Sequence, residues 1–322
     1  MTAQWHWQTE HVAADEPDRI IHADNLAVLP TLPDGQFTLI YLDPPFNTGR
    51  VQARQATRHI RQPTAADGAT VDETATDVPR PEASRTITGF AGKRYERIRG
   101  DLLQYDDRFD DYWAFLEPRL VEAWRLLADD GTLYLHLDYR EAHYAKVLLD
   151  ALFGRECFLN EIVWAYDYGA KAKRKWPTKH DTILVYVKDP SGYWFDSTAV
   201  DREPYMAPGL VTPEKAELGK LPTDVWWHTI VSPTGREKTG YPTQKPEGIL
   251  RRIVQASTRE GDWVLDFFAG SGTTGAVAAT LGRRFVLVDE NPEAIAIMRG
   301  RFADIAGVEF QVGTSRSGGV LE

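Results

Sequence analysis

An acidic residue, two prolines and an aromatic ring, Asp43-Pro44-Pro45-Phe46, directly follow the apolar run of residues 37–42. A short apolar run of this kind predicts a buried strand, so the four residues form a turn at the carboxyl end of that strand. A rigid structural turn would account for the prolines, but it would leave the acid and the ring unexplained. Together the four residues offer a carboxylate, main-chain carbonyls without competing N–H groups, and a flat apolar surface.

These groups suit the transfer of a methyl group to the amine of an aromatic base. Such an amine is a poor nucleophile because its lone pair is delocalised into the ring. The carboxylate of Asp43 and the carbonyl of Pro44 would accept its N–H bonds and hold the lone pair toward a methyl donor. Pro45 helps to fix the backbone direction, and Phe46 can stack on a base turned out of a duplex. This chemistry needs no metal, and the sequence has no Cys/His cluster that would bind one.

A glycine-rich turn, DFFAGSGTT at residues 266–274, lies between a predicted strand and a predicted helix. An open α/β sheet binds ligands at this position, and Gly270 and Gly272 let the backbone approach a ligand closely. The acids Asp289 and Glu290 follow about 20 residues later, where a ribose-binding acid is expected. The turn lacks the third glycine of a pyrophosphate fingerprint and the lysine of a P-loop. It therefore favours S-adenosylmethionine as the cofactor over a dinucleotide or a purely structural role.

Short apolar runs alternate with helical patterns over most of the chain, which predicts an α/β sheet. Strands are expected at residues 19–23, 37–42, 132–137, 161–165, 182–187, 263–267, 285–288 and 308–312. Helices are expected at residues 25–32, 111–128, 140–153 and 273–281, with two more beginning at residues 246 and 292. Two stretches do not fit this alternation. Residues 51–88 are polar and predict a mobile loop, and residues 199–240 are irregular and rich in proline.

The formal net charge of −10 argues against a protein that simply coats nucleic acid. Phosphate binding depends on local charge, however, and residues 93–99 and 171–179 are locally basic, the second with Trp176 among its cations. The sequence contains no apolar run long enough to span a membrane and no signal-peptide pattern. The single cysteine, Cys157, cannot form an internal disulfide. These observations predict a cytoplasmic protein.

The two motifs together resemble those of the amino-methylating DNA methyltransferases. That family carries a D/N/S-P-P-Y/F catalytic motif and an F-x-G-x-G cofactor motif, which here are Asp43–Phe46 and Phe268–Gly272. The catalytic motif comes first, which is similar to the order in the beta class, a circular permutation of the usual order. The resemblance extends to residues 134–140, 179–182 and 241–246. It implies a Rossmann-like S-adenosylmethionine-dependent methyltransferase sheet of the α/β class, circularly permuted, with an inserted target-recognition region.

The resemblance also implies a division of the chain. Residues 1–50 would form the catalytic-motif half of the methyltransferase domain and residues 91–165 the rest of that half, with a mobile polar loop at 51–90 between them. The target-recognition region would occupy approximately residues 166–240, and the cofactor-binding half residues 241–322.

The resemblance assigns roles residue by residue. The catalytic residues would be Asp43, Pro44, Pro45 and Phe46. Lys245 and Pro246 would lie near the methionine end of the cofactor, Asp289 or Glu290 would bind its ribose, and Asp24 would bind its adenine unless it only caps the following helix. The amino-acid part of the cofactor would contact Asp266, Phe268, Ala269, Gly270, Ser271, Gly272 and Thr273. Contacts to DNA would come from Lys171, Lys173, Arg174 and Lys175.

The implied activity is site-specific methylation of adenine N6 in duplex DNA, either within a restriction-modification system beside a cognate endonuclease or as an orphan enzyme. The protein would act as a monomer or homodimer without a membrane partner. Asp at the first position of the motif favours adenine, whereas Ser is common in cytosine-directed members of the family. The alternatives are N4-cytosine methylation, methylation of an RNA or protein-glutamine amine, an inactive nucleic-acid-binding module, and an NAD-dependent oxidoreductase.

Overall fold

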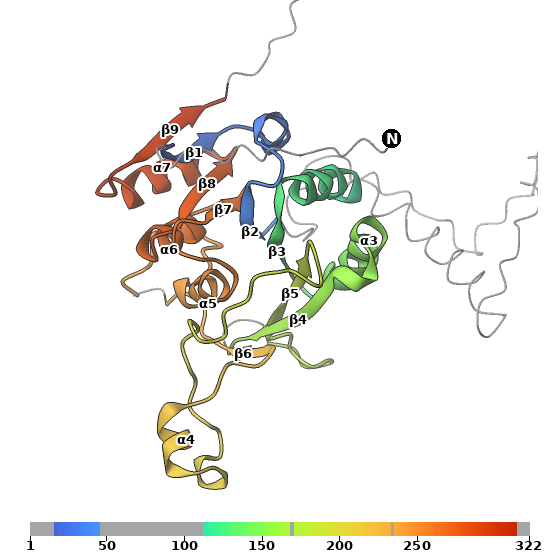
Figure 1. The fold of residues 1–322 in the computed structure, drawn as a ribbon, viewed down its shortest axis with the longest axis vertical. Helices are drawn as coiled ribbons and strands as arrows, with labels where there is room; N and C mark the ends of the chain where they lie inside the picture. The colour runs from blue at the N-terminus through green and yellow to red at the C-terminus, as the bar shows by residue number, and fades with distance from the viewer. Residues whose placement is uncertain (1–15, 46–111, 168–170, 233–234, 314–322) are drawn as a thin grey trace, which may run out of the picture. The chain divides into compact units, whose positions relative to one another are not determined.

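The computed structural model describes residues 16–45, 112–167, 171–232 and 235–313. Its centre is a nine-stranded sheet with the order β6-β4-β5-β3-β2-β7-β8-β1-β9 (Figure 1). The strands are β1 Asp18–His22, β2 Phe37–Leu42, β3 Leu127–Leu137, β4 Phe158–Ala165, β5 His180–Val187, β6 Val225–Trp227, β7 Trp263–Asp266, β8 Arg284–Asp289 and β9 Val308–Val312.

Helices connect most of these strands. They are α1 Asn25–Val28, a helix at residues 112–126, α3 Ala142–Phe153, α4 Pro213–Leu218, α5 Glu247–Ser257, α6 Thr273–Thr280 and α7 Pro292–Arg301. Short 3₁₀ helices occupy Leu29–Thr31, Arg155–Cys157 and Pro208–Leu210.

The strand directions bring most strand ends to one edge of the sheet. β5 runs antiparallel to its neighbours β3 and β4, whereas every other adjacent pair of strands is parallel. The carboxyl ends of all strands except β5 therefore lie at the same edge, together with the beginning of β5. We call this the carboxyl edge. Open α/β sheets bind their ligands at this edge.

Apolar layers cover both faces of the sheet. β2 is buried at every position, as expected for a central strand with helices on both sides. On one face α5 packs its buried residues Ile249, Leu250, Ile253 and Val254 against the sheet. On the other face, Trp124 of helix 112–126 stacks on Phe153 of α3, with 4.0 Å between ring centroids. The predicted α/β class is confirmed.

Two expected elements differ in their bounds. The helix expected at 25–32 is α1 followed by the 3₁₀ helix Leu29–Thr31, because Pro30 lacks the N–H that a continuing α-helix would use. The helix expected to reach residue 128 ends at 126, and β3 begins at Leu127 instead of Thr132. The pairing of β3 with β2 shifts register between Phe37 and Leu39. This irregularity accommodates the Asp130-Gly131 segment within the strand.

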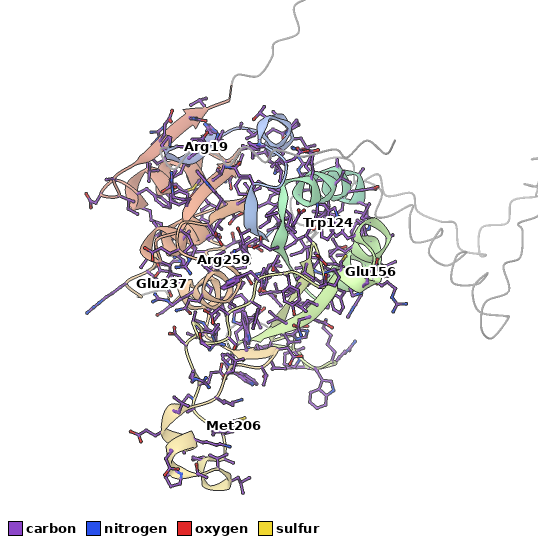
Figure 2. The ribbon with its side chains drawn as sticks, in the orientation of Figure 1. Arg19, Trp124, Glu156, Met206, Glu237 and Arg259 are labelled. Atoms are coloured by element: carbon purple, nitrogen blue, oxygen red, sulfur yellow. The ribbon has the colours of Figure 1, made fainter. Side chains whose placement is uncertain are left out.

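The irregular stretch at 199–240 contains three elements that were not predicted, which are β6, α4 and the short 3₁₀ helix Pro208–Leu210. β6 extends the sheet by pairing in parallel with β4. α4 lies in an extension away from the sheet (Figure 1), and Met206 is on the same extension (Figure 2). Thr212 caps α4 by accepting a bond from the Lys215 N–H, and Pro213 occupies its first turn. This cap-and-proline pattern is a helix-start signal that could have been found in the sequence.

Several predictions fall on residues outside the described part of the chain. These are Phe46, the polar loop at 51–90 and the basic residues at 93–99. Among the described residues, no helix has both the length and the apolar character needed to cross a membrane.

Candidate active site

The two sequence motifs meet at the carboxyl edge. Asp43 follows the end of β2, and the glycine-rich turn follows the end of β7. β2 and β7 are adjacent parallel strands, with Leu39 opposite Val264 and Ile40 opposite Leu265. Segments far apart in the sequence are thereby placed side by side at the position expected for a ligand site.

The glycine-rich turn is held by the acid that begins it. Asp266 accepts a hydrogen bond from the Phe268 N–H at 3.0 Å and one from the Thr274 hydroxyl at 2.6 Å. Gly270 and Gly272 have φ angles of 51° and 73°, which are unfavourable for residues with a Cβ atom. The turn therefore needs glycine at both positions, as the sequence pattern predicts.

Neighbouring side chains leave no room for a larger residue in this turn. A Cβ atom at Gly270 would lie 3.0 Å from the Tyr241 ring. A Cβ atom at Gly272 would lie 2.9 Å from both Met298 and Phe302. The main chain of the turn is thus packed against these residues and can approach a ligand without an intervening side chain.

Asp266 is an unusual carboxyl group. It is 3% exposed, and burial raises its pKa to about 7, against the hydrogen bonds from Thr274 and Phe268, while the charges of Asp43 and Asp289 raise it further. A cation placed beside Asp266 would favour its carboxylate form. S-adenosylmethionine carries a sulfonium and an ammonium, so the acid fits that ligand chemically.

The two acids at the end of β8, Asp289 and Glu290, lie in different environments. Asp289 accepts one bond from the Gly270 N–H at 2.7 Å and another from the Asn291 N–H at 2.8 Å. Burial raises the pKa of Asp289, although these two bonds oppose the shift. Glu290 is exposed, and its carbonyl oxygen is 3.2 Å from the His22 ring. Asp289 therefore supports the glycine turn, whereas the carboxylate of Glu290 faces solvent.

The acid of the catalytic motif is paired with a lysine. Lys245 donates a hydrogen bond from Nζ to Asp43 Oδ2, and the two side chains are only 12% and 17% exposed. Lys245 directly precedes Pro246, the N-cap residue of α5. A residue predicted to lie near the cofactor thus contacts the acid that is predicted to be catalytic. The sequence contained no signal for this pair, because the partners lie on segments far apart in the chain.

A buried polar network lies behind Asp43, and sequence reasoning missed it. The Tyr41 hydroxyl is 2.7 Å from His136 Nδ1, and His136 Nε2 is 3.3 Å from Asp181. Tyr166 donates to the other oxygen of Asp181 at 3.1 Å. The network joins β2, β3 and β5 to Tyr166, the residue that follows β4, at the carboxyl edge. A histidine and an aspartate within otherwise apolar strands were the available signal.

The two ends of this network have shifted pKa values in opposite directions. Burial, followed by the charges of Asp43, Asp266 and Asp181, raises the pKa of Tyr41 well above its usual value. The phenol stays protonated, so the Tyr41 hydroxyl retains a proton that it can donate to Nδ1 of His136. Burial opposes ionisation of Asp181, but its bonds to His136 and Tyr166 and the charge of Lys245 hold its pKa below the usual value.

Two further acids at strand ends have structural partners. Asp24 caps α1 by accepting the Leu26 N–H at 3.0 Å, and Arg119 binds the same oxygen at 3.3 Å. The capping alternative is therefore confirmed, and a contact to adenine stays a prediction. Asp138, just after β3, accepts bonds from the backbone and the guanidinium of Arg140.

The predicted DNA contacts lie on the connection between β4 and β5, which begins and ends at the carboxyl edge. Lys171, Lys173, Arg174 and Lys175 are all exposed. Lys175 Nζ lies 5.6 Å from the centroid of the Tyr139 ring, just after β3. The structure thus places these cations on the same edge as the catalytic acid.

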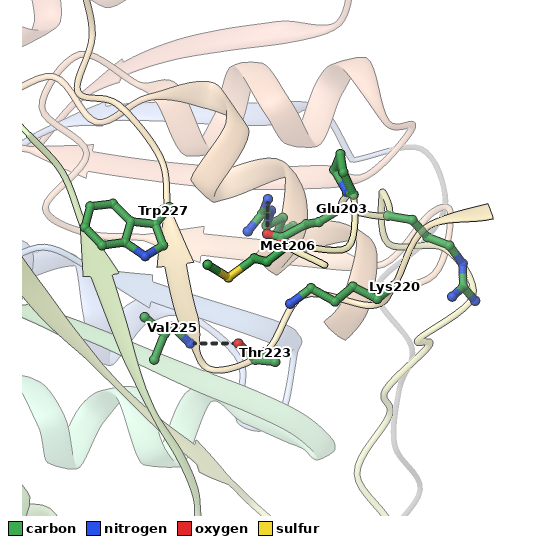
Figure 3. Close-up of a pocket in the computed structure, with 9 residues that line it drawn as sticks. Glu203, Met206, Lys220, Thr223, Val225 and Trp227 are labelled. Atoms are coloured by element: carbon green, nitrogen blue, oxygen red, sulfur yellow. Dashed lines mark hydrogen bonds and ion pairs between the residues drawn. The ribbon is translucent and has the colours of Figure 1, made fainter. Parts of the chain in front are cut away.

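A separate pocket of about 690 Å³ lies beside β6. Its lining includes Trp227, Met206 and Lys220 (Figure 3), and Arg252 forms an ion pair with Glu203 at 2.8 Å. None of its lining residues belongs to the catalytic turn or the glycine-rich turn. Eight of the nine lining residues fall within residues 166–240, and the ninth, Arg252, belongs to α5.

Comparison with known proteins identifies close relatives in sequence. A family model described as DNA methylase, of the N6/N4 type, matches residues 37–299. The DNA adenine methyltransferase YhdJ of Escherichia coli (strain K12) is 31% identical over 289 residues, covering 87% of this chain and 81% of that protein. The type II methyltransferase M.HpaI of Haemophilus parainfluenzae is 32% identical over 195 residues, covering 60% of each chain.

Solved structures share the fold at lower identity. The PvuII DNA methyltransferase (cytosine-N4-specific) matches with a TM-score of 0.56 and 15% identity, covering 90% of this chain and 88% of that one. A complex of M1.HpyAVI with S-adenosylmethionine matches with a TM-score of 0.50 and 19% identity, covering 88% and 98%. The sheet described above is therefore the sheet of known DNA methyltransferases.

Proposed function

This chain belongs to the N6/N4 family of S-adenosylmethionine-dependent DNA methyltransferases, and from that premise we propose that it methylates adenine N6 at a specific site in duplex DNA. The observation that carries the proposal is the meeting of Asp43 and the glycine-rich turn on adjacent strand ends. The turn that begins at Asp43 supplies hydrogen-bond acceptors for a target amine. The glycine-rich turn lets the backbone contact the nucleoside of the cofactor. The order of the motifs supports a circularly permuted domain with its recognition region at residues 166–240.

In the proposed mechanism, Asp43 and the Pro44 carbonyl accept the hydrogen bonds of the target amine. These contacts orient the lone pair for in-line attack. The bound cofactor supplies an electrophilic methyl group. Pro45 holds the turn, and Phe46 stacks on the extruded base. The N–C bond would form as the methyl–sulfur bond breaks, so that S-adenosylhomocysteine leaves as a neutral thioether. The extra proton on the methylated amine would then pass through its hydrogen bond to Asp43 and on to solvent.

Lys245 serves both halves of this site in the proposal. Its ammonium binds Asp43, and the carboxylate of the cofactor's methionine would give it a second anion. Because an amine needs Asp43 as an acceptor, the target must bind the oxygen that Lys245 leaves available or displace the lysine. The charge of Lys245 also acts on the carboxylate of Asp181. If the target amine displaces Lys245 from Asp43, Asp181 offers the lysine a second negative charge nearby.

The remaining cofactor contacts are proposed from position. Glu290 is the better candidate for the ribose, because both oxygens of Asp289 already accept backbone N–H bonds. Asp24 stays a candidate for the adenine ring. The amino-acid part of the cofactor would lie along the turn formed by Asp266, Phe268, Ala269, Gly270, Ser271, Gly272 and Thr273, with Lys245 and Pro246 beside it.

The raised pKa of Asp266 predicts that cofactor binding depends on pH. Near neutral pH much of this acid is protonated in the free protein, and a cationic ligand must displace that proton. Affinity for S-adenosylmethionine should therefore rise as pH increases through about 7, by up to about tenfold per pH unit. Calorimetric titration between pH 6 and 8 checks this. In Asp266→Asn, cofactor affinity should change with pH only through titration of the ligand's own amino group. A dependence on pH equal to that of the wild-type protein would contradict the role of Asp266.

The cations of the β4–β5 connection are proposed to bind DNA phosphates. Replacing Lys171, Lys173, Arg174 and Lys175 with Ala should weaken DNA binding and make it less dependent on salt concentration. Each phosphate contact that is lost means that fewer counterions are released when DNA binds. Fluorescence anisotropy at several salt concentrations measures both quantities. Replacing Arg155 with Ala serves as the control, because its side chain is 88% exposed and it lies just before β4, at the opposite edge of the sheet. Wild-type affinity and slope in the fourfold variant would place this surface away from DNA.

The choice of adenine rests on the first residue of the motif and on the printed name of YhdJ. Digesting methylated DNA to nucleosides and separating them by mass spectrometry tests it, and mapping the methylated positions identifies the recognition site. N4-methylcytosine as the only product would overturn adenine and leave the roles of Asp43 and Lys245 intact. Methylation of RNA or a protein in place of DNA would overturn the substrate class. Cytoplasmic location, a paired endonuclease and a monomeric or dimeric state stay predictions.

A further inference from the structure

Trp176 has no role in the mechanism described above. Its side chain is 93% exposed, although Trp carries one of the largest apolar surfaces of any residue. It directly follows Lys175, and the exposed cations Lys171, Lys173 and Arg174 precede it. An indole held in water within a run of cations matches a partner that offers both negative charge and flat apolar surface. Nucleic acid has both.

The position of Trp176 is set by the sheet. A hydrogen bond of 2.9 Å from the Tyr166 N–H to the Lys179 carbonyl closes the base of the β4–β5 connection. Lys175 lies over the Tyr139 ring, at 5.6 Å from the centroid. Residues 171–179 of the connection are therefore held to the sheet at Lys179 and contact it again at Lys175. Trp176 is presented from the carboxyl edge, where the catalytic turn also lies.

We propose that Trp176 enters the base stack of DNA and fills the space left by the extruded target base. This inference rests on the proposed function. In an intact duplex each base face is covered by the neighbouring base. An indole can therefore stack on a base face only where a base has left the stack. Methylation of an exocyclic amine requires such an extrusion. Stacking of an aromatic side chain on the remaining bases offsets part of its cost, while the neighbouring cations bind the flanking phosphates.

Trp227 provides a matched control. It is 70% exposed and ends β6 opposite Ala165, so it also lies at the carboxyl edge. It lines the pocket with Met206 and Lys220 (Figure 3) and stands outside the run of cations. Both tryptophans are exposed and lie at the carboxyl edge. They differ in that only Trp176 is surrounded by the run of cations.

The test compares Trp176→Ala, Trp176→Phe and Trp227→Ala on two DNA duplexes that contain the mapped recognition site. One duplex is fully paired, and the other has an abasic position opposite the target base, which makes extrusion easier. On paired DNA, Trp176→Ala should lose about tenfold or more in kcat/KM, whereas Trp176→Phe should retain most activity. On the abasic duplex the loss of kcat/KM in Trp176→Ala should shrink to about twofold, because extrusion of the target base costs less there. A purely structural defect would lower kcat/KM equally on both duplexes. The fluorescence rise of 2-aminopurine at the target position should be reduced only in Trp176→Ala.

Cofactor affinity, thermal unfolding and the salt slope of DNA binding should stay at wild-type values in Trp176→Ala, because the side chain is exposed and carries no charge. Wild-type kcat/KM on paired DNA, an equal deficit on both duplexes, or the same pattern in Trp227→Ala would overturn the inference. Each of these results leaves the proposed function standing. Absence of DNA methylation by the wild-type protein would overturn the proposed function and this inference together.

Discussion

Replacing Asp43 with Asn is expected to reduce methyl transfer by about 10³-fold or more while S-adenosylmethionine still binds. The carboxylate orients the target amine, and loss of a single preorganised polar contact in an active site commonly costs on the order of 10²–10³ in rate. Removing the negative charge also ends the ion pair with Lys245, so the effect combines lost orientation with a displaced lysine. The cofactor turn lies on a different strand and keeps its own hydrogen bonds.

Two measurements separate these effects. Tritium transfer to DNA measures catalysis, and equilibrium binding of the cofactor measures the integrity of the other half of the site. Asp34→Asn is the control, because the Asp34 side chain is 79% exposed and pairs with Arg125 far from either motif. Thermal unfolding reports whether the unpaired Lys245 destabilises the protein. Loss of cofactor binding in a folded Asp43→Asn variant would contradict the proposed division of labour.

Gly272→Ala is expected to remove cofactor binding and to destabilise the protein by about 2–5 kcal/mol. The φ angle of 73° is strained for any residue with a Cβ atom. That atom would also lie 2.9 Å from the Phe302 ring and from Met298. Relieving the overlap moves the turn or α7, and either movement changes the backbone that faces the cofactor.

Gly300→Ala distinguishes this effect from a general intolerance of alanine. Gly300 lies in α7, its φ is outside the left-handed region, and a Cβ atom there would meet no atom within 4 Å. Stability should be unchanged or slightly increased, because alanine favours the helix. Chemical unfolding and calorimetric titration of the cofactor measure both variants. Wild-type stability and affinity in Gly272→Ala would show that the turn does not need its left-handed conformation.

Local sequence patterns were sufficient to predict the elements that carry the two motifs. The apolar run before Asp43, the glycines after residue 266 and the helix-start signals each depend on neighbours in the chain. β2 and α6 accordingly lie where they were expected. The element bounds failed where a tertiary contact competes with a local preference. Leu127 pairs with Phe37 of β2, and the Asp130-Gly131 segment lies in the irregularity before Thr132, where its carbonyls accept bonds from Trp194 and Lys188.

The sequence by itself determined that Asp43 follows a buried strand, that Gly270 and Gly272 form a tight turn after another strand, and that both belong to an α/β sheet. Only the tertiary structure decided that Lys245 binds Asp43 and that His136 links Tyr41 to Asp181. Residue periodicity indicates which side of a strand is buried. It does not indicate which strand lies beside it or in what register, because those depend on packing between segments that are distant in the chain.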